Sequence, residues 1–470
     1  MSIIWWDIES SGLNPAFDQI LQFAAIRTDD DLNEIGRFEV RSRLLPFIVP
    51  SPGALRVTGL TIDDLLDERH PSYYEMVCRV REALAGWCPS AFVAYNGLRF
   101  DEEFLRQAFY QCLHPPYLTN TGGSKRADAL ALVQTAALLH PNALAVPISD
   151  KGRPVFKLDR LAPANGFDHA NAHDALADVE ATIFLCKLVK ERCPELWARF
   201  LRYATKDAVA DFIYGTDAFL LVEPSRQTAH VVTALGDHPA QNNRSYCWNL
   251  RVDPRPFAEL SNDELRGALA KSGSPVRRLK KNAAPSLCPL DEAPAHLVAP
   301  EERELFERRG RWVRRDREFV LRVLSASAEN ETEYPPSPHV ERQIYDGFWS
   351  AADSRRLQAF HGADWGQRVR IADELEDRRL AWLARRIIWV EKPDLCPEPH
   401  AKALAEEKAR RHLAEGADCG GWNTIAKATA DLGGILDDLD GQAAEPFLKL
   451  ADYLSQRRAH CERLLGPVPA

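Results

Sequence analysis

Hydrophobic and polar residues follow two rhythms over the first 192 residues. Short apolar runs are typical of buried strands, and residues 3–8, 19–28, 38–47 and 91–95 carry them. Apolar side chains that recur every three or four positions are typical of helices, as at residues 73–87, 101–110 and 175–189. Strands interleaved with helices predict a mixed α/β sheet domain.

The pattern changes near residue 192. Strand-like segments separated by turn-rich pieces predict a small β-rich domain, with strands at residues 218–222, 230–235 and 247–252 and a helix at 262–271. A proline-rich segment at 334–338 is typical of a stiff connector. Helical spacing dominates afterwards, at residues 373–390, 401–414 and 444–465. We therefore predict three domains, at residues 1–192, 193–338 and 339–470.

Composition limits the class of protein. The chain has 470 residues, of which 45% are hydrophobic and 27% charged, as in globular proteins. Its ten cysteines show no C-x-x-C spacing, which argues against a zinc ribbon and predicts reduced, mostly buried thiols. No apolar run approaches the length of about 18 residues that suggests a membrane span. We expect a cytoplasmic monomer that does not associate with membranes.

Charge is unevenly distributed along the chain. The net charge of -9 disfavours a protein that coats nucleic acid. Residues 193–338 are the most basic third and contain two basic runs. The run Arg277-Arg278-x-Lys280-Lys281 has no acidic neighbours, and we expect it to face DNA or the acidic tail of a partner. The run at 308–317 follows several glutamates, which favours a solvated helix face.

Two acidic residues close the first predicted strand. Asp7 and Glu9 are two positions apart, so their side chains share one face of a strand. Two carboxylates that close repel each other unless a cation lies between them. Alone, such a pair more often lies at a solvated strand end, but together with further site residues it predicts a divalent-metal site.

Three residues far along the chain are candidates for the rest of this site. Asp101 follows a short strand and the turn Asn96-Gly97, the usual place for a site carboxylate in an open α/β sheet. His173 precedes a predicted helix, and Asp178 lies about one turn inside it. A histidine beside a carboxylate cluster can accept a proton from water. Taken singly, Asp101 reads as a helix cap and His173 as structural; together with the acidic pair they predict a hydrolytic site.

In this order, Asp7-x-Glu9, Asp101 and His173-x4-Asp178, the five residues resemble the DEDD exonucleases of the ribonuclease H-like fold, in the His-x4-Asp branch. Several segments are similar to the bacterial exonuclease I family: residues 22–29, 52–54, 164–166, 171–175, 187–190 and 345–350. The resemblance spans nearly the whole chain and is strongest over residues 1–192.

The resemblance implies an exodeoxyribonuclease that degrades single-stranded DNA processively from the 3' end to 5'-mononucleotides, in DNA repair and recombination. It also implies an α/β ribonuclease H-like domain, an SH3-like β-rich domain and an α-helical C-terminal domain. Asp7, Glu9 and Asp178 would bind two Mg²⁺ ions, for which Mn²⁺ could substitute. Asp101 would complete the cluster, partly through water, and His173 would be the general base.

Substrate and partner contacts follow from the same resemblance. Besides Glu9, the residues expected to hold the strand are Arg106, Tyr117 and Lys157, each of which could equally be a surface charge or a half-buried ring. The implied protein partner is the C-terminal tail of single-stranded DNA-binding protein. Ser11 and the segment 119–124 depart from the family pattern, where aromatic residues are usual.

Two other functions remain open from the sequence. A 3'-to-5' exoribonuclease or a proofreading-type exonuclease would use the same five residues, because these residues do not read the sugar. The long chain beyond residue 192 argues against a compact oligoribonuclease. The other class is an inactive binding module that recruits repair partners, which the intact set of five site residues disfavours.

Overall fold

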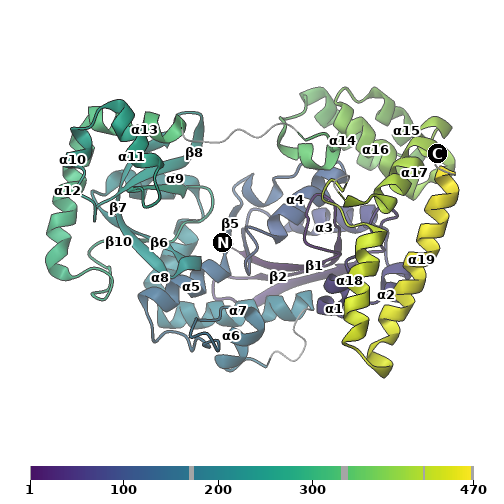
Figure 1. Cartoon of the computed structure of the whole chain (residues 1–470), viewed down its shortest axis with the longest axis horizontal. Coiled ribbons are helices and arrows are strands. Elements are labelled where there is room, and N and C mark those ends of the chain that lie inside the picture. The colour runs from purple at the N-terminus through teal and green to yellow at the C-terminus, as the bar shows by residue number, and fades with distance from the viewer. Residues whose placement is uncertain (1, 169–173, 330–336, 417–418, 467–470) are drawn as a thin grey trace.

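The computed structural model describes residues 2–168, 174–329, 337–416 and 419–466. In this part of the chain two five-stranded sheets lie side by side (Figure 1). The first sheet has the strand order β3-β2-β1-β4-β5. Its strands are β1 (Ile3–Ser10), β2 (Ile20–Thr28), β3 (Glu34–Arg41), β4 (Ala91–Ala94) and β5 (Lys125–Asp128). Strands β3, β2 and β1 pair antiparallel, whereas β4 and β5 continue the sheet in parallel.

Both faces of the first sheet are buried, since residues of β1 alternate between two hydrophobic cores. Ile4, Trp6 and Ile8 join the core beneath the helices at residues 73–87 and 101–111, while Ile3 and Trp5 join the core beneath the helices at residues 129–139 and 175–192. The helices of this part are α1 (Pro52–Thr58), α2 (Ile62–Leu66), α3 (Tyr73–Trp87), α4 (Asp101–Gln111), α5 (Ala129–Leu139), α6 (Leu158–Ala164), α7 (Ala175–Arg192) and α8 (Pro194–Arg202). The predicted mixed α/β fold of this part is confirmed.

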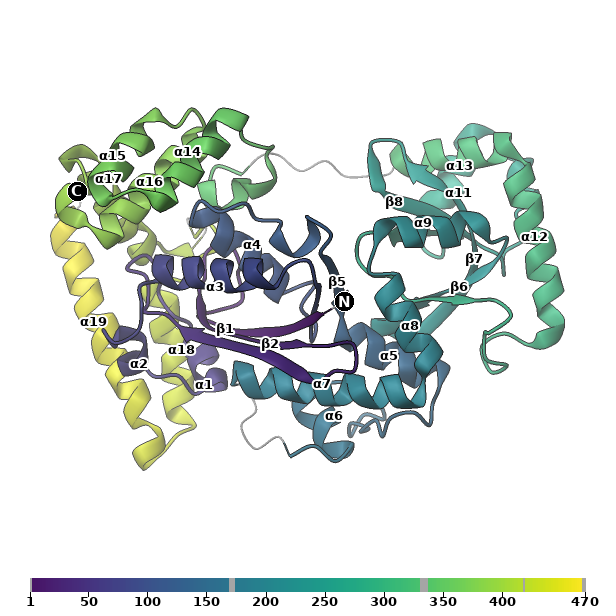
Figure 2. The ribbon, with the colours of Figure 1, turned by 180° about the vertical axis from the view of Figure 1, so that it is seen from behind.

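The second sheet is antiparallel throughout, with the order β10-β6-β7-β8-β9. Its strands are β6 (Phe219–Glu223), β7 (Thr228–His238), β8 (Gln241–Asn249), β9 (Val276–Lys280) and β10 (Leu287–Pro289). The helices that follow or cover it are α9 (Lys206–Gly215), α10 (Arg255–Ala258), α11 (Asn262–Ala270), α12 (Arg303–Arg315) and α13 (Arg317–Glu329). Seen from behind, this body adjoins α5 and α8 and lies away from α18 and α19 (Figure 2).

The last part of the described chain is helical, as predicted. Its helices are α14 (Ala351–Gly362), α15 (Trp365–Glu374), α16 (Arg378–Glu391), α17 (Glu398–Leu413), α18 (Ile425–Asp437) and α19 (Glu445–Leu465). The helix predicted at 373–390 starts too early, because residues 373 and 374 end α15 and α16 begins only at Arg378. Leu375 is extended, and Asp377 caps α16 by accepting a hydrogen bond from the Arg379 amide. Hydrophobic spacing alone does not reveal this break, because it continues on both sides.

The predicted bounds of one strand also differ from the structure. The strand predicted at 38–47 is β3, at Glu34–Arg41, on the edge of the sheet. An edge strand with charged side chains lacks the apolar run of a buried strand. The prediction therefore extends over the apolar residues that follow β3 and leaves out its charged first half. The proline-rich segment 334–338 lies largely outside the described residues. All ten cysteines are free, and most are buried, as expected.

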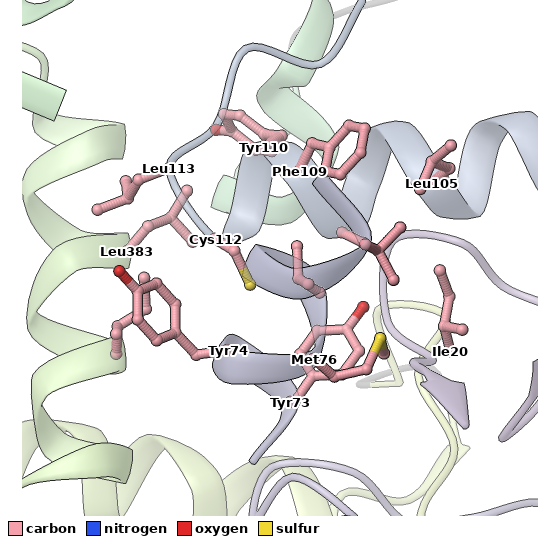
Figure 3. Packing of buried hydrophobic residues seen from close by; sticks show 14 of the residues in the cluster. Ile20, Tyr73, Tyr74, Met76, Leu105, Phe109, Tyr110, Cys112, Leu113 and Leu383 are labelled. Carbon is pink, nitrogen blue, oxygen red and sulfur yellow. The ribbon is translucent and has the colours of Figure 1, made fainter. Parts of the chain in front are cut away.

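The helical part shares its core with the first sheet domain. Side chains of α3 and α4, such as Tyr74 and Phe109, lie in one hydrophobic cluster with Leu383 of α16 (Figure 3). A second cluster joins α1 and α2 to α18 and α19. Burying apolar area at about 25 cal/mol per Å² makes these contacts the main attraction between the two parts. The C-terminal helices therefore pack against the side of the first sheet domain that carries α3 and α4.

A polar cluster of Cys78, His114 and His361 lies within this shared core. The two imidazole rings stack at 3.8 Å, and the Cys78 sulfur lies 3.4 Å from His114 Nε2. His361 Nδ1 is 2.9 Å from the Tyr74 hydroxyl, and its Nε2 is 3.1 Å from the carbonyl oxygen of Leu113. Both nitrogens of His361 are thus engaged within the protein, so the cluster satisfies buried polar groups where two parts of the chain meet.

Among the described helices, none is both long and apolar enough to cross a membrane.

Candidate active site

The central strand β1 presents two carboxylates near its carboxyl end. Asp7 and Glu9 lie opposite Ala24 and Gln22 of β2, and they share one face of the sheet. The parallel pairing of β1 with β4 stops at Trp5 and Val93, so Asp7 lies where β4 gives way to the turn before α4. The sheet thereby places both acids at the carboxyl end of its parallel strands, where ligands bind in open α/β folds.

Helix α7 brings the third carboxylate to this pair. Asp174 caps the helix by accepting hydrogen bonds from the amides of Leu176 and Ala177, at 3.1 and 3.3 Å. The cap fixes the first turn, which carries Asp178. Each of Asp7, Glu9 and Asp178 offers a carboxylate oxygen, and these oxygens all lie within 4.8 Å of one another. Residues 171 positions apart in the sequence thus form one cluster.

Asp101 approaches from the first turn of α4. It is 4% exposed and lies near the backbone amide of Ile8 on β1, which partly offsets the rise in pKa that burial causes. The turn before α4 is sharp, since Asn96 has a positive φ of 64°. Asp128, at the end of β5, holds this turn by accepting hydrogen bonds from the amides of Asn96 and Leu98 at 3.0 and 3.3 Å. The position of Asp101 therefore depends on two neighbouring strands.

Gly97 is the residue in this turn that has no room for a side chain. A Cβ atom there would lie 2.3 Å from Ala94 Cβ and 3.2 Å from Asp101 Oδ2. We expect Gly97→Ala to displace the turn and Asp101 with it, and to lower kcat about 10- to 100-fold, because an ångström of misplacement is costly in catalysis. Steady-state kinetics of the hydrolysis measure this fall in kcat. Gly86→Ala in α3 is the control, because a Cβ atom at Gly86 would meet no atom within 4 Å. A Gly97→Ala enzyme with wild-type kcat would contradict this role.

The electrostatics of the cluster match a site built for positive charge. Burial, followed by repulsion from Asp178, Asp101 and Asp174, raises the pKa of Glu9 to about 9. Burial and the surrounding carboxylates, Asp101 first, raise the pKa of Asp7 well above its usual value. Burial also raises the pKa of Asp101 to about 7. These carboxylates are costly together in the absence of a cation.

The donor set itself indicates which metals fit. Asp7, Glu9 and Asp178 offer carboxylate oxygens, which hard divalent cations such as Mg²⁺ and Mn²⁺ prefer. Carboxylates that repel one another without a metal are stabilised when a divalent ion lies between them, so the residues present fit such an ion. His173, the predicted general base, lies outside the described residues.

The predicted strand-binding residues separate into two groups. Lys157, just before α6, lines a cavity of about 1020 Å³ together with Asp178, Tyr95, Arg153 and Arg226. Arg106 instead lies within an ion-pair network, 3.0 Å from the buried Glu102, with its guanidinium over the ring of Tyr117 at 5.3 Å. The structure thus brings Lys157 to the acidic cluster and pairs Arg106 with Tyr117 elsewhere on α4 and its following loop.

A second cavity, of about 1010 Å³, runs between the two sheet domains. It is lined by Arg99 and Asp128 on one side and, on the other, by basic residues of the second sheet and of the turn between β6 and β7: Arg226, Arg244, Arg277, Arg278 and Lys280. Lys281 does not join them, because it is buried and its Nζ lies 2.7 Å from both carboxylate oxygens of Asp237. Most of the first basic run therefore faces a groove, while its last lysine is structural.

The second basic run differs from the solvated face expected for it. Arg309 donates to the carbonyl oxygen of Leu250 at 2.7 Å, and Arg314 donates to that of Thr216 at 2.7 Å. Arg311 lies 3.8 Å from Asp217. These arginines tie α12 to the sheet and its neighbouring loops, so part of this run is structural.

Sequence reasoning missed several residues that frame the site. Asp174, besides capping α7, accepts hydrogen bonds from Gln22 at 3.1 Å and Arg41 at 3.2 Å. Asp128 and Glu102 were also overlooked. An aspartate directly before a predicted helix is a capping signal that could have marked Asp174. No local signal marks Asp128 as the anchor of a turn more than thirty residues earlier, nor the bonds that tie Glu102 to Arg126 at 2.8 Å.

Comparison with known proteins agrees with this geometry. The family model described as exonuclease (RNase_T) matches residues 4–185. Exodeoxyribonuclease I of Escherichia coli (strain K12) is 32% identical over 384 residues, which cover 76% of this chain and 78% of that protein. Exodeoxyribonuclease I of Haemophilus influenzae is 31% identical over 414 residues, which cover 82% of this chain and 84% of that protein.

Solved structures are similar over nearly the whole chain. Exonuclease I from Methylocaldum szegediense has a TM-score of 0.83 and 26% identity, and the match covers 98% of this chain and 99% of that one. E. coli exonuclease I in complex with a dA16 oligonucleotide has a TM-score of 0.81 and 25% identity, covering 98% of this chain and 100% of that one.

Proposed function

The chain belongs to the exodeoxyribonuclease I family, and on that premise we propose that it removes mononucleotides from the 3' end of single-stranded DNA with Mg²⁺ as its cofactor. The observation that carries the proposal is the cluster of Asp7, Glu9 and Asp178, whose carboxylate oxygens lie within 4.8 Å of one another. Beside it lie Asp101 and a cavity lined by cationic and aromatic side chains.

In this proposal the carboxylates have distinct tasks. Asp7, Glu9 and Asp178 would hold the metal, and Asp101, near the Ile8 amide, would complete the cluster from α4. When bound there, divalent cations would supply the positive charge that activates the attacking water and stabilises the leaving 3' oxygen. His173 accepts the proton of that water as it attacks phosphorus, so the products are a 5'-mononucleotide and a strand shortened by one residue.

The substrate path follows the cationic cavities. Lys157, Arg153 and Arg226 line the cavity beside Asp178, where they would neutralise phosphates near the scissile bond. Arg99, Arg244 and Arg278 line the neighbouring groove between the sheet domains and would hold the strand further from its end. Two grooves of this kind suit a flexible single strand better than a stiff duplex.

We also propose the finer attributes implied by the family. The chain has three domains, at residues 1–192, 193–338 and 339–470, of which the second is SH3-like. The enzyme acts as a cytoplasmic monomer in DNA repair and recombination, and it binds the acidic C-terminal tail of single-stranded DNA-binding protein. The basic side of the groove, with Arg277 and Arg278, has a charge that suits either the DNA strand or such a tail.

A digestion assay tests the function. The enzyme is incubated with 3'-labelled and 5'-labelled single-stranded DNA, duplex DNA and RNA, with Mg²⁺ or with EDTA. We expect release of the 3' label as mononucleotide from single-stranded DNA alone, and no release in EDTA. Activity that persists in EDTA, or equal activity on RNA, would refute the proposal. Equal activity on RNA would instead favour the exoribonuclease alternative, because discrimination needs contacts to the 2' position.

A further inference from the structure

The segment of residues 11–18 leads from β1 towards β2 and closely follows the proposed metal ligand Glu9. We call this segment the β1–β2 loop. The register between β1 and β2 shifts between Glu9 and Ser10, so the regular ladder ends beside the carboxylate. An irregularity of this kind changes the direction in which a neighbouring side chain points. The direction of the Glu9 side chain therefore depends on how the loop is held.

Asp18 makes the β1–β2 loop a compact unit. Its carboxylate accepts hydrogen bonds from the Ser11 hydroxyl at 3.2 Å and from the Asn14 amide at 2.9 Å. A Cβ atom at Gly12 would clash with the same carboxylate, so the loop closes tightly around Asp18. A contact at one point of such a unit fixes the position of the whole loop.

The helical part of the chain holds this unit at two points. Phe17 is 6% exposed, and its ring meets the ring of Trp422 edge to face, with centroids 5.5 Å apart. Trp422 lies between α17 and α18. His339, from the segment before α14, meets the Phe17 ring at 5.7 Å. Asn14 Nδ2 donates a hydrogen bond to the carbonyl oxygen of Gly421 at 2.8 Å. Residues from the last third of the sequence therefore fix the loop that follows Glu9.

Trp422 is itself held on several sides. Its Nε1 donates a hydrogen bond to the carbonyl oxygen of Arg411 on α17 at 2.9 Å, and the Arg411 guanidinium lies over the Trp422 ring at 5.2 Å. The same guanidinium pairs with the buried Glu341 at 2.7 Å. A Cβ atom at Gly420 would clash with the Trp422 ring and with His339. A ring with this support can hold the β1–β2 loop in one position.

We propose that Trp422 is a positioning residue of the active site: by packing against Phe17 it fixes the β1–β2 loop, and the loop aims Glu9 at the divalent metal. This inference rests on the function proposed above. Asp7 lies within the regular ladder, and the first turn that carries Asp178 is set by the cap of α7, so neither depends on this support. Removing a group that orients a metal ligand typically weakens metal binding about 10- to 100-fold. The helical part thus acts on the chemistry as well as on the fold.

The experiment measures metal binding without DNA. Mn²⁺ is titrated by calorimetry into metal-free wild-type protein, Trp422→Ala, Trp422→Phe and the control Gly434→Ala. We expect Trp422→Ala to weaken Mn²⁺ binding about 10- to 100-fold, because Glu9 is no longer aimed at the ion. Trp422→Phe keeps a ring against Phe17 and should stay within about threefold of wild type. Gly434→Ala on α18, where a Cβ atom meets nothing within 4 Å, should stay within about twofold.

A second control separates positioning from general destabilisation. Leu357 on α14 is 3% exposed and lies in the core that the helical part shares with the first sheet domain. Leu357→Ala should lower the melting temperature, because it leaves a cavity in that core. It should leave the Mn²⁺ affinity within about twofold of wild type, since it touches neither Trp422 nor the β1–β2 loop. Hydrogen exchange at the amides of the loop should become faster in Trp422→Ala and not in Leu357→Ala.

The Mn²⁺ affinities decide the role of Trp422. A lower melting temperature of Trp422→Ala with wild-type Mn²⁺ affinity would overturn the inference, because Trp422 would then serve the fold alone. So would an equal loss of affinity in Leu357→Ala. If Trp422→Ala does not fold, Asn14→Ala, which removes the hydrogen bond to Gly421, takes its place. A loss of about threefold or more in its Mn²⁺ affinity supports the inference, and wild-type affinity overturns it. Wild-type protein that binds Mn²⁺ but leaves single-stranded DNA intact would refute the proposed function alone.

Discussion

Replacing Asp178 by alanine will abolish cleavage of single-stranded DNA while leaving the strand bound. The substitution removes one of three carboxylates whose oxygens lie within 4.8 Å of one another, so the remaining two cannot hold the metal in the same geometry. We expect the single-turnover rate to fall by about three orders of magnitude or more, equivalent to a loss of at least about 4 kcal/mol of transition-state stabilisation. Binding of the DNA strand, which depends on cationic side chains and aromatic rings, should change little.

The same substitution has an opposite effect on stability. Asp178 repels Asp7 and Glu9, and alanine relieves that repulsion in metal-free protein. We expect Asp178→Ala to melt at an equal or higher temperature than wild type in EDTA, and we expect Mg²⁺ to raise the melting temperature of the wild-type protein but not that of the variant. Calorimetry with and without the ion measures both effects.

Asp431→Ala is the matched control, because Asp431 is exposed on α18. It should retain wild-type cleavage and the wild-type response to Mg²⁺. Wild-type cleavage by Asp178→Ala would show that the metal is held elsewhere.

Glu341→Ala will cause the largest loss of stability that we expect from a residue outside the catalytic site. Glu341 is 1% exposed and accepts hydrogen bonds from Arg386 of α16 and Arg411 of α17, both at 2.7 Å. Alanine leaves both guanidinium groups without their shared counter-charge, and breaking a buried pair in this way costs about 3–5 kcal/mol. The free energy of unfolding and the melting temperature should both fall, with faster hydrogen exchange in α16 and α17.

The contribution of Glu341 depends on pH in a definite direction. Burial raises its pKa, but Arg386 and Arg411 outweigh burial and hold the pKa at about 2, below the ordinary value of 4.5. A carboxyl with a lower pKa in the folded state contributes its stability above about pH 4.5 and loses it as the pH falls towards 2. This shift corresponds to about 3 kcal/mol. The gap in melting temperature between wild type and Glu341→Gln should therefore narrow as the pH falls below about 4.5.

Glu406→Ala is the matched control for this charge cluster. Glu406 pairs with Arg410 on the same helix, α17, at 2.6 Å, but Arg410 is 65% exposed. An exposed pair of this kind contributes at most about 1 kcal/mol. Equal destabilisation by Glu406→Ala and Glu341→Ala, or a gap for Glu341→Gln that does not change with pH, would show that the buried cluster has no special role.

The proposed catalytic residues were open to sequence reasoning because their order and spacing along the chain form one motif. The two-residue spacing of Asp7 and Glu9 puts them on one face of a strand wherever that strand lies. Asp178 follows from its place in the first turn of a helix, and Asp101 from its place after a strand and a tight turn. Short apolar runs made β1 and β2 clear, and helical spacing made α3 clear, while the charged edge strand β3 and the break between α15 and α16 gave no such signal.

The sequence by itself determined the α/β class of the first domain and which acids could share a site, because periodicity and order along the chain survive without knowledge of distant contacts. Only the tertiary structure decided the use of side chains that have several possible partners. It placed Arg106 in an ion pair with Glu102, buried Lys281 against Asp237, and left Phe348 exposed beside Tyr117. The energy of a charge or a ring depends on its burial and its partners, and the folded chain as a whole supplies both.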